Sequence, residues 1–193
     1  MSEDSGLIYK PIGPDSWADL AVLFGERGAR GGCWCMRWRL PRLQFEQQKG
    51  SRNRRTFKAG VEQGKIRGII GYAGGIPVAW CSVGLRTEFV GLQASELLAP
   101  VDEKDVWSIA CFFIQKKFRL QHVSIGLLEA AVNYIQTLGG EIVEGYPLVP
   151  IKEKIPVAFA WTGFESVFKS AGFVEVERRV EIRPIMRYYF PEK

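Results

Sequence analysis

The hydrophobic pattern of the chain is clearest between residues 106 and 138. Val106–Ile114 is an almost continuous apolar run, rich in β-branched and aromatic residues, which predicts a buried strand. After a polar and basic turn at residues 115–119, apolar residues recur at helical spacing, which predicts a helix over 123–138. The expected buried face of this helix consists of Leu128, Ala131, Val132, Ile135 and Leu138.

Shorter patterns predict the elements on either side of this stretch. A first strand at Leu7–Lys10 precedes a helix that starts near Trp17, and Ser51 is placed to cap a second helix that runs to about Gln63. Gly74-Gly75 separates two apolar runs, 66–72 and 76–85, which is a strong hairpin signal. The segment 86–105 has no clear periodicity and is expected to be a loop with one helical turn.

The C-terminal third adds a strand at 141–146, a helix at 163–171 and two strand-like segments between 173 and 190. Strand, helix and strand within about 40 residues favour a parallel crossover. The order of elements predicts an α/β (α+β) fold, with a mixed, mostly antiparallel central sheet and helices on both faces. The aromatic C-terminal strand is expected at a sheet edge, where it could pair with a second copy in a homodimer.

Length and composition indicate a globular protein. The chain of 193 residues, 47% hydrophobic and 24% charged, is expected to form one domain over residues 1–193. No apolar run is long enough for a membrane span, so we expect a soluble, cytoplasmic protein without a membrane partner. Four cysteines and a single histidine, His122, do not form a zinc pattern, and we predict no metal site. For Cys33 and Cys35 we expect a role in packing or in a substrate loop.

The positive charge is concentrated in one segment. Residues 37–58 contain eight basic side chains and one acid, a net charge of +7, although the whole chain carries only +5. This basic segment, from Arg37 to Lys58, is either a solvated helical surface or a binding surface for an acidic partner. Nucleic-acid binding is the less favoured of these interpretations.

The predicted strand, basic turn and helix at 106–138 together indicate an anion site. The first turn of a helix has unpaired N–H groups and a partial positive charge, which suit a phosphate ester. Lys116, Lys117 and Arg119 add full charges at the same place.

The same stretch resembles the pyrophosphate-binding loop of the GNAT superfamily of N-acetyltransferases, whose pattern is R/Q-x-x-G-x-G/A. Arg119 matches the first position, whereas His122 and Ser124 stand at the glycine positions. Trp107–Ile114 resembles the strand that carries acetyl-CoA, and the segment from Phe168 to Phe173 resembles the late YxxxGF motif. The similarity covers about residues 69–176 and implies acetyl-CoA as cosubstrate.

The resemblance also implies which residues bind the cosubstrate. Pantetheine would pair with the strand edge, where a backbone N–H near Phe112 or Phe113 would stabilise the developing oxyanion. The implied contacts to acetyl-CoA are Phe112, Phe113, Ile114, Arg119, Leu120, Gln121, His122, Val123, Ser124 and Phe168.

Acyl transfer to an amine requires a group that takes a proton from the amine. We predict Glu144 as this base, with Glu141 second, because a carboxylate near apolar strands can have its pKa raised toward neutrality. An ordinary strand-end carboxylate is the alternative. The family's tyrosine acid is replaced by Phe168, so Tyr146 is the predicted acid, with Ser108, Ser166 or water as alternatives. A further alternative is that the step needs no acid from the protein, because a CoA thiolate is a tolerable leaving group.

The acceptor side is expected after the first helix. There Trp34 and Trp38 either line a substrate pocket or cap the core. The resemblance implies an N-acetyltransferase that acts on an amine of a small molecule or peptide. The alternatives are an acyl-CoA sensor without catalysis and a nucleic-acid-binding module that uses the basic segment.

Overall fold

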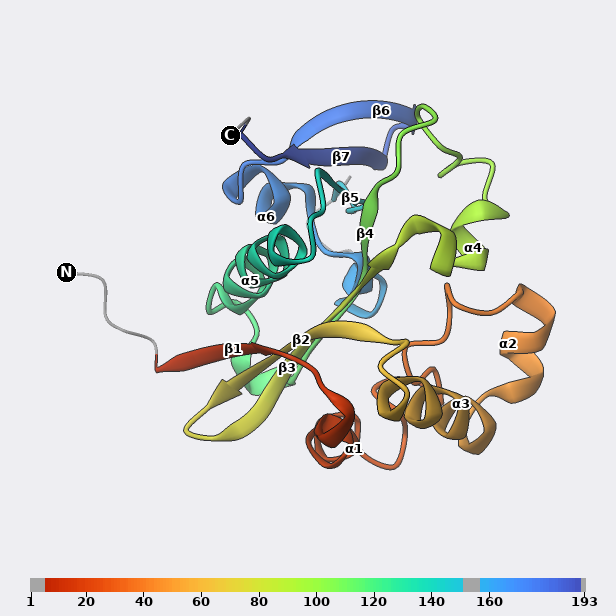
Figure 1. Ribbon diagram of the computed structural model, residues 1–193, viewed down its shortest axis with the longest axis vertical. Helices are drawn as coiled ribbons and strands as arrows, with labels where there is room; N and C mark the ends of the chain where they lie inside the picture. The colour runs from red at the N-terminus through yellow and green to blue at the C-terminus, as the bar shows by residue number, and fades with distance from the viewer. Residues whose placement is uncertain (1–5, 151–156, 192–193) are drawn as a thin grey trace.

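A computed structural model describes residues 6–150 and 157–191, and its centre is a seven-stranded mixed sheet (Figure 1). The order of strands across the sheet is β1-β2-β3-β4-β5-β7-β6. Their bounds are β1 Leu7–Pro11, β2 Arg67–Ala73, β3 Ile76–Leu85, β4 Trp107–Ile114, β5 Ile142–Gly145, β6 Val174–Val180 and β7 Arg183–Tyr189. All neighbouring pairs are antiparallel except β4 and β5. The predicted mixed, mostly antiparallel sheet is therefore confirmed.

Helices cover both faces of this sheet, as predicted. Figure 1 shows α5 and α6 on one side, and α1, α2 and α3 on the other. The α-helices are α1 Trp17–Phe24, α2 Arg42–Gln48, α3 Ser51–Glu62, α4 Val90–Gln93, α5 Val123–Thr137 and α6 Glu165–Ser170. Four short 3-10 helices connect these elements: η1 Pro14–Ser16, η2 Arg86–Glu88, η3 Lys116–Phe118 and η4 Val157–Thr162.

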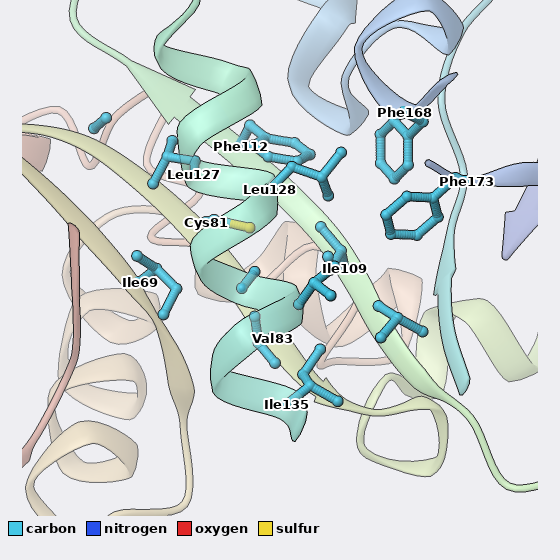
Figure 2. Close-up of a cluster of buried hydrophobic side chains, with 14 of the residues drawn as sticks. Ile69, Cys81, Val83, Ile109, Phe112, Leu127, Leu128, Ile135, Phe168 and Phe173 are labelled. Atoms are coloured by element: carbon cyan, nitrogen blue, oxygen red, sulfur yellow. The ribbon is translucent and has the colours of Figure 1, made fainter. Parts of the chain in front are cut away.

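The main core lies between α5 and the sheet (Figure 2). Alternate residues of the strands, including Ile69, Cys81 and Ile109, point toward the buried face of α5, as expected when strand side chains alternate between the two faces. Four of the five residues predicted for that helix face are buried, whereas Leu138 lies just past the helix and is 42% exposed.

Gly126 positions the first turn of α5 against β1. A Cβ at this position would lie 2.6 Å from the hydroxyl oxygen of Tyr9, so only glycine lets the Tyr9 ring pack there. The Tyr9 hydroxyl in turn donates a 3.4 Å hydrogen bond to the carbonyl of Val123 at the start of the helix.

A second, aromatic core lies on the opposite face. Phe24, Trp34, Phe57 and Trp80 are buried there, with ring centroids about 6 Å apart. Such stacked, tilted and edge-to-face pairs contribute roughly 0.5–1.5 kcal/mol each beyond area burial. This core fixes the loop between α1 and α2 on the sheet.

Several sequence expectations need correction. The C-terminal strand β7 lies between β5 and β6, so the edges of the sheet are β1 and β6, and the argument for a homodimer through β7 is lost. Gly50, with φ +84°, precedes α3 in place of Ser51, which is the first helical residue. Helix α2 was not predicted, because Phe45 is its only buried residue and leaves no apolar period to detect.

Candidate functional site

The site begins where the parallel strands β4 and β5 separate. Their pairing covers three positions and ends at Ile109 opposite Gly145, although β4 continues to Ile114. A bulge at Ala110 accompanies this change, because Ser82 pairs with Cys111 while the next residue of β3, Val83, pairs with Ile109. Within the described chain, residues 110–114 of β4 thus have no strand partner on the β5 side. The short helix η4 contacts β4.

The basic turn and the start of α5 follow directly from this strand. The Nε of Arg119 donates a 2.9 Å hydrogen bond to the carbonyl of Ile114, which ties the turn to the end of β4. Leu120 and His122 adopt left-handed backbone angles, with φ of 61° and 59°. His122 is the N-cap of α5, so the glycine position of the family pattern has the conformation that favours glycine.

The turn presents its side chains to solvent. Leu120, Gln121 and His122 are exposed, whereas Val123 is buried against the core and Ser124 is half-buried. Since α5 has 15 residues and no acidic residue in its first turn, its N-terminal N–H groups remain a favourable place for an anion.

Phe168 fills the space where the two strands diverge. Its ring is fully buried and lies edge-to-face with Phe112, at a centroid distance of 6.1 Å. A Cβ on Gly145 would lie 2.0 Å from the Phe168 ring, so this glycine is required for the ring to rest on β5. Phe168 acts here as a packing residue between β4, β5 and α6.

A buried polar network lies on the opposite side of the same junction. The carboxylate of Glu144 accepts hydrogen bonds from Arg86 at 3.1 Å, from Arg187 at 2.8 Å and from the Tyr146 hydroxyl at 2.8 Å. Arg187 also forms a bidentate pair with Asp102, which lowers the pKa of Asp102 to about 2. The network connects β5 and β7 with the loop around residue 102.

Tyr146 links this network to β4. Its hydroxyl lies 2.8 Å from the Ser108 hydroxyl and accepts a 2.7 Å hydrogen bond from Arg86. Burial, followed by the charge of Glu144, raises the pKa of Tyr146, so the phenol stays neutral near pH 7. Arg86 also donates to the carbonyls of Leu92 and Leu98. These contacts hold η2, α4 and the following loop beside the end of β5.

A small cavity lies next to the β4 bulge on the face of the aromatic core. It measures about 10 Å³, which is room for about one water molecule. Trp38 and Trp161, whose ring centroids are 5.5 Å apart, form part of its wall. The other lining residues are Cys33, Cys35, Arg37, Ser82, Phe89, Ala110 and Cys111.

This geometry can be compared with known proteins. No protein-family model matches the sequence, and no curated protein matches it either. Solved structures do match, over almost the whole chain. The PaiA N-acetyltransferase of Thermoplasma acidophilum in complex with coenzyme A superposes with a TM-score of 0.55 at 10% identity, covering 95% of this chain and 99% of that one. The chain has the GNAT fold.

Two further structures with this fold show the same extent of similarity. A GNAT-family acetyltransferase from Streptococcus pneumoniae gives a TM-score of 0.54 at 12% identity, covering 96% of this chain and 99% of that one. The yncA structure from Salmonella typhimurium, with its cofactor acetyl-CoA, gives 0.52 at 9% identity, covering 97% and 96%. The expected similarity in fold is thus confirmed.

The GNAT fold brings the predicted cosubstrate residues together. Phe112, Phe113 and Ile114 lie on the unpaired part of β4, and residues 119–124 follow at the start of α5. Phe168 packs behind Phe112, so its ring is separated from solvent. The contacts of these residues with acetyl-CoA remain a prediction.

The predicted catalytic carboxylate has an unexpected environment. Glu144 was expected near apolar strands, but its fully buried carboxylate lies between two guanidinium groups. Glu141, the second candidate, is exposed and precedes β5. The geometry therefore favours a structural role for Glu144 over the role of a base.

The two predicted acceptor residues are separated by the fold. Trp34 is 1% exposed and stacks on Trp17 in the aromatic core, so the structure supports the packing interpretation for this residue. Trp38 lines the cavity, and its buried Nε1–H has no hydrogen-bond partner among the described residues.

The basic segment from Arg37 to Lys58 does not form one open surface. Arg39 is buried, with its side chain 7% exposed, and it pairs with Glu88. Arg37 lies over Trp38 and Phe45, while Arg54 lies over Trp17 and Trp34. Much of this charge therefore covers the aromatic core, and the remaining exposed charges lie mainly on α3.

Sequence reasoning did not identify Arg86, Arg187, Cys111 or Trp161 as part of the site, whereas Cys35 lies in the loop for which a packing or substrate role was expected. The signal that could have found Arg86 and Arg187 is their position beside apolar strands, because a guanidinium buried there needs a partner of opposite charge. The sequence does not say which carboxylate that partner is. Over residues 6–150 and 157–191, no group of three or more His, Cys, Asp or Glu side chains is arranged so that it could hold a metal ion. In the same ranges no helix is long and apolar enough to cross a membrane.

Proposed function

We propose that the chain is an acetyl-CoA-dependent N-acetyltransferase that moves an acetyl group to an amine of a small molecule or peptide. The observation that carries this proposal is the divergence of β4 and β5 after Ile109, which leads along an unpaired strand edge to the anion site of α5. Structures with the same fold contain coenzyme A or acetyl-CoA.

The edge of β4 supplies the groups that pantetheine would need. The N–H of Gln115 donates to the carbonyl of Val78 on β3 at 2.9 Å. Because backbone groups alternate in direction along a strand, the N–H of Phe113 also faces β3, whereas those of Phe112 and Ile114 face the unpaired side. Of the two predicted oxyanion donors, we therefore favour Phe112.

The basic turn would bind the pyrophosphate. Arg119 is held by Ile114 at the end of β4, and Lys116 and Lys117 are exposed in η3. The first-turn N–H groups of α5 and these three cations together suit a doubly anionic pyrophosphate. The backbone of His122 has the required conformation, but its imidazole adds bulk where the pattern has a hydrogen atom.

The chemistry requires three tasks from the protein. The thioester carbonyl is polarised by the Phe112 N–H, the acceptor amine enters beside Trp38, and the network of Glu144 holds the end of β5 in place beside β4. Neutral Tyr146 and Ser108 lie at the base of this opening and connect its two strands through their 2.8 Å contact.

The proposed function is tested with a panel of polyamines, aminoglycosides, amino acids and peptides. We expect acetyl-CoA-dependent release of thiol with at least one acceptor class, and the acetylated amine as product. A thermal shift with acetyl-CoA but no turnover with any acceptor would instead support the sensor without catalysis.

The substitution His122→Gly is expected to tighten acetyl-CoA binding several-fold, as measured by calorimetry. Glycine adopts the φ of 59° without strain and lets phosphate oxygens approach the backbone. His122→Asn is the control, because asparagine also tolerates this conformation but retains a side chain. If Asn and Gly tighten binding equally, relief of backbone strain is the cause and crowding by the imidazole is not.

A further inference from the structure

Three of the four cysteines meet at the bulge of β4. Cys33 and Cys35 come from the loop between α1 and α2, and Cys111 comes from β4, where it pairs with Ser82. All three line the small cavity together with Ala110. This is the point from which β4 continues without a strand partner on the β5 side. Cys81 belongs to the core on the opposite face, beneath α5 (Figure 2).

The backbone of the loop turns Cys35 toward the sheet at an energetic cost. Trp34 and Cys35 are consecutive residues with left-handed backbone angles, φ 47° and 57°. Such a conformation is unfavourable for a residue with a Cβ. Packing offsets this cost: the Trp34 ring lies over Gly28, where a Cβ would be 2.3 Å from the ring nitrogen.

The surroundings of Cys35 stabilise a thiolate. The indole N–H of Trp80 donates a 3.2 Å hydrogen bond to the Cys35 sulfur. Interaction with the Cys111 side chain, the Trp80 hydrogen bond and the nearby Arg39 guanidinium together outweigh burial and lower the pKa of Cys35 to about 7. The same contact with Cys35 and the burial of Cys111 raise the pKa of Cys111, so it stays protonated. Burial likewise raises the pKa of Cys33.

A buried N–H group on the wall of the cavity lacks an acceptor. It is Trp38 Nε1, which has no hydrogen-bond partner among the described residues. Leaving a buried donor unpaired is unfavourable. Because Trp38 Nε1 is a donor, it suits an oxygen atom brought by a ligand, such as the carbonyl oxygen of an acyl group.

Resting on the proposed function, we propose that Cys35 is an acyl-accepting nucleophile, so that acetyl passes from CoA to the Cys35 sulfur and then to the amine. The thiolate attacks the thioester carbon, a new C–S bond forms, the bond to the CoA sulfur breaks, and CoA leaves as a thiolate that water protonates. The acceptor amine then attacks S-acetyl-Cys35, the amide forms, Cys35 leaves as a thiolate, and the amine proton goes to solvent.

This route needs no oxidant or reductant, because one thioester replaces another. The cavity holds about one water molecule in this state, so part of its lining must move for the acetyl group to enter. Once formed, the acyl-cysteine would place the acetyl carbonyl beside Trp38, on the acceptor side of the sheet.

The test is the intact mass of the protein after incubation with acetyl-CoA, without an amine and with a phosphine reductant, quenched in acid. We expect one acetyl group per chain, mapped to Cys35 and removed by neutral hydroxylamine, which cleaves thioesters and spares amides. The acetylation rate should rise as the pH passes about 7, where Cys35 loses its proton, and level off above that.

The variant Cys35→Ser should lose this adduct and retain the thermal shift with acetyl-CoA, which shows that it folds and binds. The control Cys81→Ala, on the other face of the sheet, should still be acetylated. Turnover of wild-type protein without acetyl-Cys35 in rapid-quench samples, or full activity in Cys35→Ser, would overturn the inference and leave the proposed function intact. Absence of both the thermal shift and turnover in wild type would overturn the two together.

Discussion

Glu144→Gln is expected to lower the free energy of unfolding by about 3 kcal/mol, in the range found when one partner of a buried ion pair is removed. The carboxylate is fully buried and neutralises Arg86 and Arg187 at once. With Asp102 the four charges balance, so the neutral amide leaves one uncompensated positive charge in the interior. Urea denaturation monitored by circular dichroism measures the difference.

The matched control is Glu141→Gln, which removes the same charge from an exposed position just before β5. Its stability should change by less than about 0.5 kcal/mol, as for most surface substitutions. If Glu144→Gln instead leaves stability unchanged and lowers only kcat, Glu144 acts as the base that the sequence indicated, and the structural role assigned to it is wrong.

Arg119→Glu is expected to weaken acetyl-CoA binding at least tenfold, measured by calorimetry. The substitution removes a cation that would face the pyrophosphate, and it breaks the 2.9 Å bond from Nε to the Ile114 carbonyl. A charged hydrogen bond contributes roughly 1.5–3 kcal/mol, and about 1.4 kcal/mol is a factor of ten. The substitution thus removes both the cation that would bind the pyrophosphate and the hydrogen bond that fixes the end of β4.

Arg52→Glu is the control for net charge. Arg52 is exposed on α3, which lies on the other side of the sheet from α5, and the substitution changes the total charge equally. An equal loss of affinity in both variants would show that the general positive potential of the protein binds acetyl-CoA, and would contradict a local site at α5.

The central part of the site could be predicted because its signals are local. The apolar run before Gln115 and the helical period after His122 define β4, the turn and α5, and these elements are contiguous in the chain. The glycine pattern of the pyrophosphate-binding loop is only partly present in the sequence, since His122 stands at a glycine position. The left-handed backbone of His122 shows that the loop nevertheless keeps the conformation that a glycine would adopt there.

The environment of Glu144 could not be predicted, because its partners are distant in sequence. Arg86 follows β3 in a segment without periodicity, and Arg187 lies in β7, which the fold places next to β5. A strand inserted between earlier strands leaves no mark in the hydrophobic pattern. The convergence of Cys35 and Cys111 depends on the same kind of long-range contact.

The most direct test of the proposed cosubstrate is calorimetric titration of the wild-type protein with acetyl-CoA. The structure predicts saturable binding of one acetyl-CoA per chain that free coenzyme A competes away, since both share the pyrophosphate and pantetheine contacts. No binding at millimolar acetyl-CoA would contradict the assignment of β4 and the start of α5 as its site.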